Sequence, residues 1–173
     1  MANRAQQAID HPWLIPAAIA AVSLGALGVA LVAQYVGGLQ PCILCLYQRY
    51  AYGAALAAGV IGVAVGSHPS LRRLAVAAAA LAFLAGAGVA FFHVGVEQLW
   101  WRGTAECHAP AFDPNASIAD LRQQLLQTDF AACDRIPWSL FGISIAGYNM
   151  LASLVFAAAS LWAAARMGKA AGR

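Results

Sequence analysis

The stretch LQPCILCLYQRYAYG, from Leu39 to Gly53, holds two cysteines three residues apart and an arginine four residues after the second. A proline precedes the first cysteine, and most neighbouring residues are apolar enough to enter a membrane. Because a charged side chain is expensive inside a membrane, an arginine in such a segment indicates a functional site. The stretch therefore links the fold of this chain to a site with two thiols and a permanent cation.

The composition of the 173-residue chain is that of an integral membrane protein. Hydrophobic residues make up 62% of the chain and charged residues only 10%, whereas soluble domains carry about 25% charged residues. A bilayer core about 30 Å thick needs about 20 apolar residues per helix, and the sequence offers four such runs. We expect transmembrane spans at about residues 14–33, 46–65, 74–94 and 143–165.

These spans predict an all-α membrane protein, a left-handed bundle of four transmembrane helices in one domain of residues 1–173. The G-x-x-x-G spacing of Gly62 and Gly66 favours close packing of such helices. We expect outer loops at about residues 34–45 and 95–142, and the cytoplasmic segments are too short for a second domain. No nucleotide-binding loop or metal cluster is evident, and we expect neither a metal nor a nucleic acid partner.

The first span has an alternative interpretation as a cleaved secretory signal, because Arg4 precedes it and small residues follow. Its apolar core is longer than the 7 to 15 or so residues usual in signals. Removing it would also leave only three spans. We therefore expect this segment to be retained as a helix.

The positions of the basic residues predict the orientation in the membrane. Basic residues near the ends of spans accumulate on the cytoplasmic side, and six of the ten fall on one side: Arg4, Arg72, Arg73, Arg166, Lys169 and Arg173. Both termini would then be cytoplasmic. The outer loop at 95–142 holds six of the seven acidic residues, which fits a translocated segment.

All four cysteines then fall on the outer side of the membrane. Cys42 and Cys45 lie beside the first outer loop, and Cys107 and Cys133 lie in the long one. An even number of cysteines that all face an oxidising compartment indicates two disulfide pairs.

The first pair is expected to be chemically active. In Cys-X-X-Cys at a helix N-terminus, backbone amides near the first thiol favour its thiolate, so that the pair can open and close. The alternatives are half of a structural zinc site or two small apolar fillers. Zinc would require two further ligands, and His93 and His108 are the only outer candidates.

Arg49 lies one helical turn after Cys45, so both side chains share one face of a helix and the guanidinium lies deeper in the membrane. The alternative is an arginine that extends to the outer headgroups. Charge-based topology does not explain its position, because positive charge is disfavoured on that side.

The second pair encloses a predicted short amphipathic helix on the outer membrane surface. Its signals are a capping-box-like start and helical spacing of apolar residues: Ser117, Asp120, Ile118, Leu121 and Leu125. As a simple staple, the disulfide between Cys107 and Cys133 would stabilise the loop by about 3 to 4 kcal/mol. Alternatively, a mobile loop would bring either cysteine to a soluble partner or to the first pair.

Three segments follow one another along the chain: QPCILCLYQR, then FFHVGVEQ with its histidine, and, after a long outer loop with two cysteines, CDRIPWSLFGISIAGYN. In this order they resemble the DsbB family of bacterial quinone-dependent disulfide-generating membrane proteins. The resemblance covers nearly the whole chain, and the ordered combination is specific where a lone Cys-X-X-Cys is not. It implies a multi-pass protein of the bacterial inner membrane with periplasmic cysteines.

The resemblance implies an electron route through catalytic cysteines. A reduced periplasmic DsbA-like thioredoxin-fold protein would attack the loop disulfide at Cys107, and exchange with Cys133 and the first pair would follow. Cys45 would pass the electrons to a bound quinone, ubiquinone or menaquinone, from the membrane pool. Arg49 and His93 would bind this cofactor.

Several alternatives remain open in the sequence. His93, at the outer end of a span, could be a hydrated helix end. Gln48 replaces the acidic residue that the family resemblance predicts before the arginine, which leaves the role of that acid in doubt. For the whole chain, the alternatives are a relay like vitamin K epoxide reductase, which would carry its Cys-X-X-Cys late in the chain, and a non-catalytic scaffold braced by two disulfides.

Overall fold

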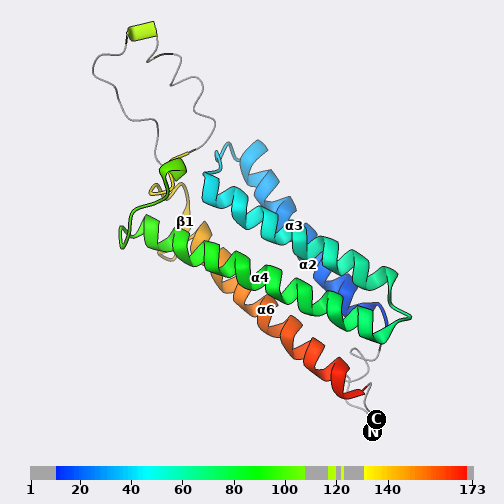
Figure 1. Cartoon of the computed structure of the whole chain (residues 1–173). Helices are drawn as coiled ribbons and strands as arrows, with labels where there is room; N and C mark the ends of the chain where they lie inside the picture. The colour runs from blue at the N-terminus through cyan, green and yellow to red at the C-terminus, as the bar shows by residue number, and fades with distance from the viewer. Residues whose placement is uncertain (1–10, 108–116, 120–121, 123–130, 171–173) are drawn as a thin grey trace.

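The computed structural model describes residues 11–107, 117–119, 122 and 131–170, the last three without their side chains. Four long helices lie side by side along one direction (Figure 1): α2 (Leu14–Tyr35), α3 (Ile43–Ala64), α4 (Pro69–Glu97) and α6 (Ile145–Ala170). The expected all-α architecture is confirmed for these residues. The expected interfacial helix falls almost entirely on residues outside the described ones, including Asp120, Leu121 and Leu125.

Three of these helices are long and apolar enough to cross a membrane. They are α2, α4 and the Ile145–Met167 part of α6, with mean hydropathies of 2.3, 2.3 and 1.5. The 22-residue helix α3 is as long as α2, but it is not among them, because Gln48, Arg49 and its tyrosines lower its hydropathy. The membrane character of the chain is confirmed, and a fourth span in α3 stays a prediction.

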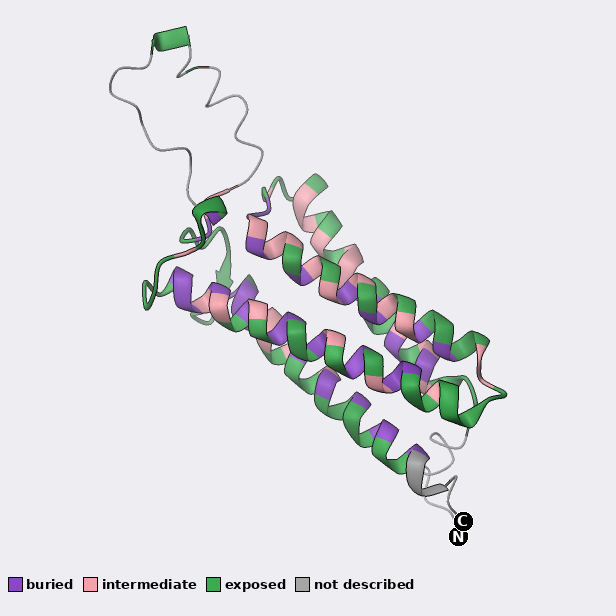
Figure 2. Ribbon diagram, viewed as in Figure 1, coloured by how far each residue is buried: buried purple, intermediate pink, exposed green. Residues whose placement is uncertain are grey.

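The helices pack in a sequential order, with α3 between α2 and α4, and α4 between α3 and α6. Buried residues follow the facing sides of the helices, and exposed residues cover the outward sides (Figure 2). Outward apolar side chains such as Leu24, Val29 and Leu81 are more than half exposed. An apolar exterior of this kind suits a lipid environment rather than water.

The centre of the bundle is built from small residues around a few aromatic rings. Ala55 and Ala79 are fully buried, and Phe83 packs edge-on against Tyr52 with ring centroids 5.8 Å apart. The Tyr52 hydroxyl lies 3.2 Å from Ser153 Oγ of α6 and shares a hydrogen bond with it. Small residues let the helix backbones approach closely, which is the main source of packing energy between helices in lipid.

Glycines allow the closest approach, between α2 and α3. A Cβ on Gly59 would lie 2.8 Å from the backbone nitrogen of Ala20, and one on Gly62 would lie 2.9 Å from Pro16 Cβ. Real Cβ atoms do not approach other heavy atoms so closely, so a larger residue at either position would push the two helices apart.

At the end of the bundle where α3 begins and α4 ends, the chain folds back onto α4 and α6. Trp101 stacks on Phe92, and its Nε1 donates a hydrogen bond of 2.9 Å to the Phe92 carbonyl. The one-turn helix η1 (Ala105–Cys107) follows, and a hairpin of β1 (Ser139–Leu140) and β2 (Ile143–Ser144) leads into α6. Its turn contains Phe141 and Gly142, both with positive φ. These segments surround the end of the bundle where the cysteines lie.

Candidate redox site

The first cysteine pair lies at the N-terminus of α3. Cys42 is the N-cap residue, and its sulfur accepts a hydrogen bond of 3.2 Å from the backbone N–H of Cys45. The two sulfurs are 2.7 Å apart and unbridged. The geometry agrees with a pair that can close into a disulfide with only small movements.

The surroundings of Cys42 favour its protonated form. The hydrogen bond with the Cys45 sulfur and then burial raise the pKa of the Cys42 thiol far above its usual range. The helix amides lower this pKa, but by less. The structure therefore differs from the expectation that the helix N-terminus makes Cys42 the thiolate, because burial and the second sulfur outweigh the amides.

His93 connects this pair to three helices. It lies on α4 with Nε2 3.5 Å from Cys42 Sγ, and its Nδ1 lies 3.1 Å from the side-chain nitrogen of Gln48 on α3. The Gln48 oxygen in turn accepts a hydrogen bond of 2.5 Å from Asn149 on α6. His93 is only 4% exposed, so it is a buried, partnered side chain and not a hydrated helix end.

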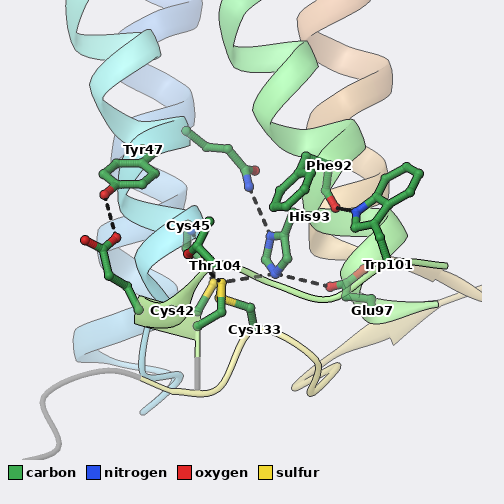
Figure 3. Close-up of a disulfide and its surroundings, with 12 residues drawn as sticks. Cys42, Cys45, Tyr47, Phe92, His93, Glu97, Trp101, Thr104 and Cys133 are labelled. Carbon is green, nitrogen blue, oxygen red and sulfur yellow. Dashed lines mark hydrogen bonds and ion pairs between the residues drawn. A yellow bond between two sulfur atoms is a disulfide. The ribbon is translucent and has the colours of Figure 1, made fainter. Parts of the chain in front are cut away.

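Glu97 lies one turn after His93, and its carboxylate and Cys42 Sγ approach the same ring nitrogen of His93 from opposite sides (Figure 3). Its Oε1 is 3.9 Å from His93 Nε2, and its Oε2 accepts a hydrogen bond of 2.5 Å from Ser144. Ser144 Oγ also accepts from the backbone N–H of Gly147 in the first turn of α6. Glu97 is 8% exposed, so a buried acidic group lies at the site. It ends α4 and accepts its hydrogen bond from Ser144 of β2.

Arg49 lies on a different side of α3 from these groups. Its guanidinium donates hydrogen bonds to Gln34 Oε1, at 2.5 Å, and to the Ala30 carbonyl, at 3.3 Å, both on α2. No carboxylate pairs with it among the described residues. The structure thus places Arg49 one turn from Cys45 but brings it to α2, while His93 contacts the cysteines from α4.

The loop cysteines form a disulfide, Cys107–Cys133. Both residues are buried, and the backbone N–H of Cys133 donates to the Cys107 carbonyl at 3.2 Å. They belong to one apolar cluster with Cys42, Leu44 and Val96. The two pairs, far apart in the sequence, therefore pack against each other.

Two hydrogen bonds fasten the loop to the start of α3. The Tyr47 hydroxyl donates to Glu106 Oε2 at 2.9 Å (Figure 3), next to Cys107. The backbone N–H of Ala131 donates to the Pro41 carbonyl at 3.3 Å, next to Cys42. These contacts hold the loop disulfide over the first pair.

A cavity of about 360 Å³ adjoins the loop disulfide. It is lined by Val96, Leu99, Trp100, Trp101, Arg102, Gly103, Cys107 and Asp134. Because Cys107 is one of its walls and Cys133 is not, an attacking group that enters this space meets Cys107 first.

Three residues of the site were not singled out in the sequence: Asn149, Ser144 and Gln34. Asn149 donates to Gln48, Ser144 holds Glu97, and Gln34 holds Arg49. Gln48 was noted only as a departure from the family pattern, and the structure places it against His93. Their common signal is a polar side chain within or beside an apolar run, which indicates an internal partner in a membrane helix.

Comparisons with known proteins agree with this site. A model of the family described as "Disulfide bond formation protein DsbB" matches residues 13–163. The disulfide bond formation protein B of Herminiimonas arsenicoxydans is 35% identical over 143 residues, 81% of this chain and 87% of its own. That of Aromatoleum aromaticum is 33% identical over 150 residues, 84% of this chain and 88% of its own. That of Chromohalobacter salexigens is 36% identical over 130 residues, 72% and 74% of the two chains.

Proposed function

The chain belongs to the DsbB family of disulfide bond formation proteins, and we propose that its two cysteine pairs act in series within the shared buried cluster. As a member, it is a quinone-dependent, disulfide-forming oxidoreductase of the membrane that reoxidises DsbA. This membership decides against a vitamin K epoxide reductase type of relay and against a non-catalytic scaffold.

The observation that carries the proposal is the packing of Cys107 and Cys133 against Cys42 in one apolar cluster. A thiolate of the reduced DsbA-type partner attacks Cys107, breaks the loop disulfide and forms a mixed disulfide. The second partner thiol resolves it, which releases the oxidised partner and leaves Cys107 and Cys133 reduced. These thiols then open the Cys42–Cys45 disulfide, so one disulfide forms for each one that breaks.

The reduced first pair is reoxidised within the membrane. A quinone supplies the oxidising power, because it takes up two electrons and two protons for each disulfide formed. Cys45, in the first turn of α3 and one turn from Arg49, would be the sulfur that passes electrons to this acceptor. Cys42, whose pKa is raised, keeps its proton until it closes the disulfide with Cys45.

The residues present fit a quinone site beside α3. Arg49 is half-buried, donates only to neutral oxygens of α2 and has no carboxylate partner among the described residues. A cation that is not neutralised stabilises negative charge on an acceptor in a medium of low dielectric constant. Arg49 would therefore orient the acceptor, and ubiquinone and menaquinone both offer it a ring oxygen.

His93 is proposed to act on the Cys42 side of the site. Asn149 donates to Gln48, and the Gln48 nitrogen faces His93 Nδ1, so the hydrogen of the neutral ring lies on Nε2. Nε2 then donates toward Cys42 Sγ at 3.5 Å, which stabilises negative charge on this sulfur as it attacks or leaves. The same ring would also help to hold a bound quinone beside the first pair.

The proposal includes the number of membrane spans and their orientation. We infer that α3 is the fourth span, because it lies between two membrane-spanning helices and equals α2 in length. The excess of basic residues at one end supports cytoplasmic termini and periplasmic cysteines in the inner membrane. An interfacial helix after residue 117 would rest its apolar side chains on the outer leaflet.

The order of the relay is tested by trapping. In a Cys133→Ser variant, the Cys107 thiol is first converted to a mixed disulfide with thionitrobenzoate, and a reduced DsbA that lacks its second thiol is added. The DsbA thiolate should displace thionitrobenzoate and accumulate in a mixed disulfide with Cys107, visible as a shift on a non-reducing gel. A Cys42→Ser, Cys45→Ser control with the loop disulfide intact should accumulate less of this species, because the Cys133 thiol that the attack releases displaces DsbA again. If the trapped species forms only through Cys42 or Cys45, the loop pair is a staple and the proposed order is wrong.

A further inference from the structure

Three ligand atoms that thiophilic metal ions prefer lie together at the outer end of the bundle. The sulfurs of Cys42 and Cys45 and a ring nitrogen of His93 all lie within 4.8 Å of one another. In the part of the chain that the structure describes, no other group of three or more histidine, cysteine or acidic residues has this arrangement. The sequence offered His93 and His108 as the only outer candidates for the further ligands of a zinc site, and the fold brings His93 to Cys42 from 51 residues away.

The distances agree with a tetrahedral site after a small adjustment. Zinc binds thiolate sulfur at about 2.3 Å and imidazole nitrogen at about 2.0 to 2.1 Å, which places such sulfur and nitrogen atoms about 3.6 Å apart. Cys42 Sγ and His93 Nε2 are 3.5 Å apart. The two sulfurs are 2.7 Å apart and would have to separate to about 3.8 Å, which a rotation of one cysteine side chain accomplishes.

Glu97 is a candidate for a fourth ligand, but its carboxylate would have to move toward the sulfurs, because it does not belong to the group whose atoms all lie within 4.8 Å of one another. Its Oε1 is 3.9 Å from His93 Nε2, close to the distance of about 3.4 Å expected between nitrogen and oxygen ligands of zinc. Its other oxygen accepts a hydrogen bond from Ser144, which holds the carboxylate beside His93. Gln48 lies 3.1 Å from Nδ1, and its amide, once turned together with the Asn149 amide that donates to it, accepts the hydrogen that the ring carries there when Nε2 binds a metal.

We propose that the reduced Cys42–Cys45 pair, together with His93 and Glu97, binds a thiophilic divalent cation such as Zn²⁺ or Cd²⁺. Binding forms two metal–sulfur bonds and releases the two thiol protons, without a change of oxidation state. The disulfide form has no thiolate to offer, so the site exists only while the pair is reduced. A bound cation therefore blocks reoxidation of the pair; this consequence rests on the proposed function, whereas the binding itself does not.

The binding is tested without quinone or partner. The parent protein carries Cys107→Ser and Cys133→Ser, so that only the first pair contributes thiols, and it is reduced, freed of quinone and titrated with Cd²⁺ in detergent. One equivalent should produce sulfur-to-cadmium charge-transfer absorption and protect both cysteines from alkylation. Competition with a chromophoric chelator gives the affinity for Zn²⁺.

Variants distinguish a metal site that includes His93 and Glu97 from chelation by the two thiols alone. His93→Ala and Glu97→Gln should each weaken binding by at least about 10-fold, and His93→Cys should restore most of the affinity that alanine loses. His68→Ala is the matched control and should change nothing, because His68 precedes α4 at the opposite end of the bundle and is exposed. Thermal unfolding of the oxidised variants identifies any that fail to fold, and His93→Cys provides the test if alanine is not tolerated.

Equal affinities of the parent and the His93→Ala variant would overturn the proposal, since two thiols alone would then account for binding. Absorption that also develops in the oxidised protein would place the cation elsewhere. With all four cysteines present, Zn²⁺ should stop reoxidation by quinone and a chelator should restore it; binding without this loss would overturn the inhibitory role. Failure of the proposed function would instead appear as absent DsbA oxidation in metal-free protein.

Discussion

The two cysteine pairs have the same chemistry and different surroundings. Cys42 and Cys45 lie three residues apart at a helix N-terminus, with the imidazole of His93 at 3.5 Å and the guanidinium of Arg49 one turn away. Cys107 and Cys133 lie 26 residues apart in the long loop that follows α4. Their sulfurs lie in an apolar cluster beside the Thr104 hydroxyl, and the charged residues Arg102 and Asp134 line the cavity next to Cys107. Cys42 thus has the ionisable ring of His93 directly beside its sulfur, whereas the reactivity of the second pair depends more on access.

This difference suggests a division of labour. A pair with fixed charges nearby can control which sulfur is ionised and can support electron transfer to a membrane acceptor. A pair whose reactivity depends more on access suits exchange with a protein thiol, provided that the loop can present it. Four changes test whether the two pairs differ in this way.

Replacing Cys45 by serine should separate the two pairs most clearly. The loop disulfide should still oxidise about one equivalent of DsbA, but catalytic turnover should fall by at least about 10³-fold, because the route to quinone is lost. The assay is DsbA oxidation in excess over the enzyme. The converse variant, Cys107→Ser, should lose DsbA oxidation, while quinone still reoxidises a first pair that dithiothreitol has reduced. Loss of both reactions in both variants would contradict the proposal that the two pairs act in series.

Arg49→Met tests which reaction the cation serves. If Arg49 chiefly orients the acceptor, the apparent KM for quinone should rise by about 10- to 100-fold, while alkylation of Cys45 changes little. Arg49→Lys should rescue only partly, because lysine lacks the planar fork of donors. Slower alkylation of Cys45 at neutral pH, recovered at higher pH, would assign Arg49 to the sulfur instead. Quinone kinetics and alkylation like those of the unchanged protein would reduce Arg49 to a headgroup anchor.

The raised pKa of Cys42 predicts a pH dependence that the loop pair lacks. In the fully reduced protein, alkylation of Cys42 should be slow at neutral pH and rise about 10-fold per pH unit beyond the range in which ordinary thiols have levelled off. Peptide mass spectrometry separates this residue from Cys107 and Cys133. As the folded protein holds this proton more tightly than the unfolded chain, its stability in the reduced form should fall as pH rises above the ordinary thiol pKa. An alkylation profile equal to that of Cys107 would contradict this prediction.

Tyr47→Phe tests how firmly the loop is held over the first pair. The change removes the hydrogen bond to Glu106 and should slow exchange between the pairs by about 2- to 10-fold. Quinone reduction by an already reduced first pair should not change. Tyr50→Phe is the matched control, because Tyr50 lies one turn away and is 69% exposed. Equal slowing in both variants would show that the hydrogen bond between Tyr47 and Glu106 does not hold the loop over the first pair.

The helices and their membrane character follow from the sequence alone. Long apolar runs have only one way to satisfy their backbone hydrogen bonds in lipid, so composition and run length predict helices there. The same reasoning is less informative for α3. The expected span began at about residue 46, whereas α3 begins at Ile43 with Cys42 as its N-cap. Gln48 and Arg49 also lower the hydropathy of this helix, although it packs between α2 and α4.

The sequence also determined which residue types the site contains, since spacing in a helix places Arg49 one turn from Cys45 and Glu97 one turn from His93. It did not determine which side chains meet across helices. Only the tertiary structure brought His93 to Cys42 and Gln48, turned Arg49 toward α2 and buried the loop disulfide against the first pair. The physical reason is that local backbone geometry fixes neighbours within one or two turns, whereas contacts between distant segments depend on how each helix rotates and packs against the others.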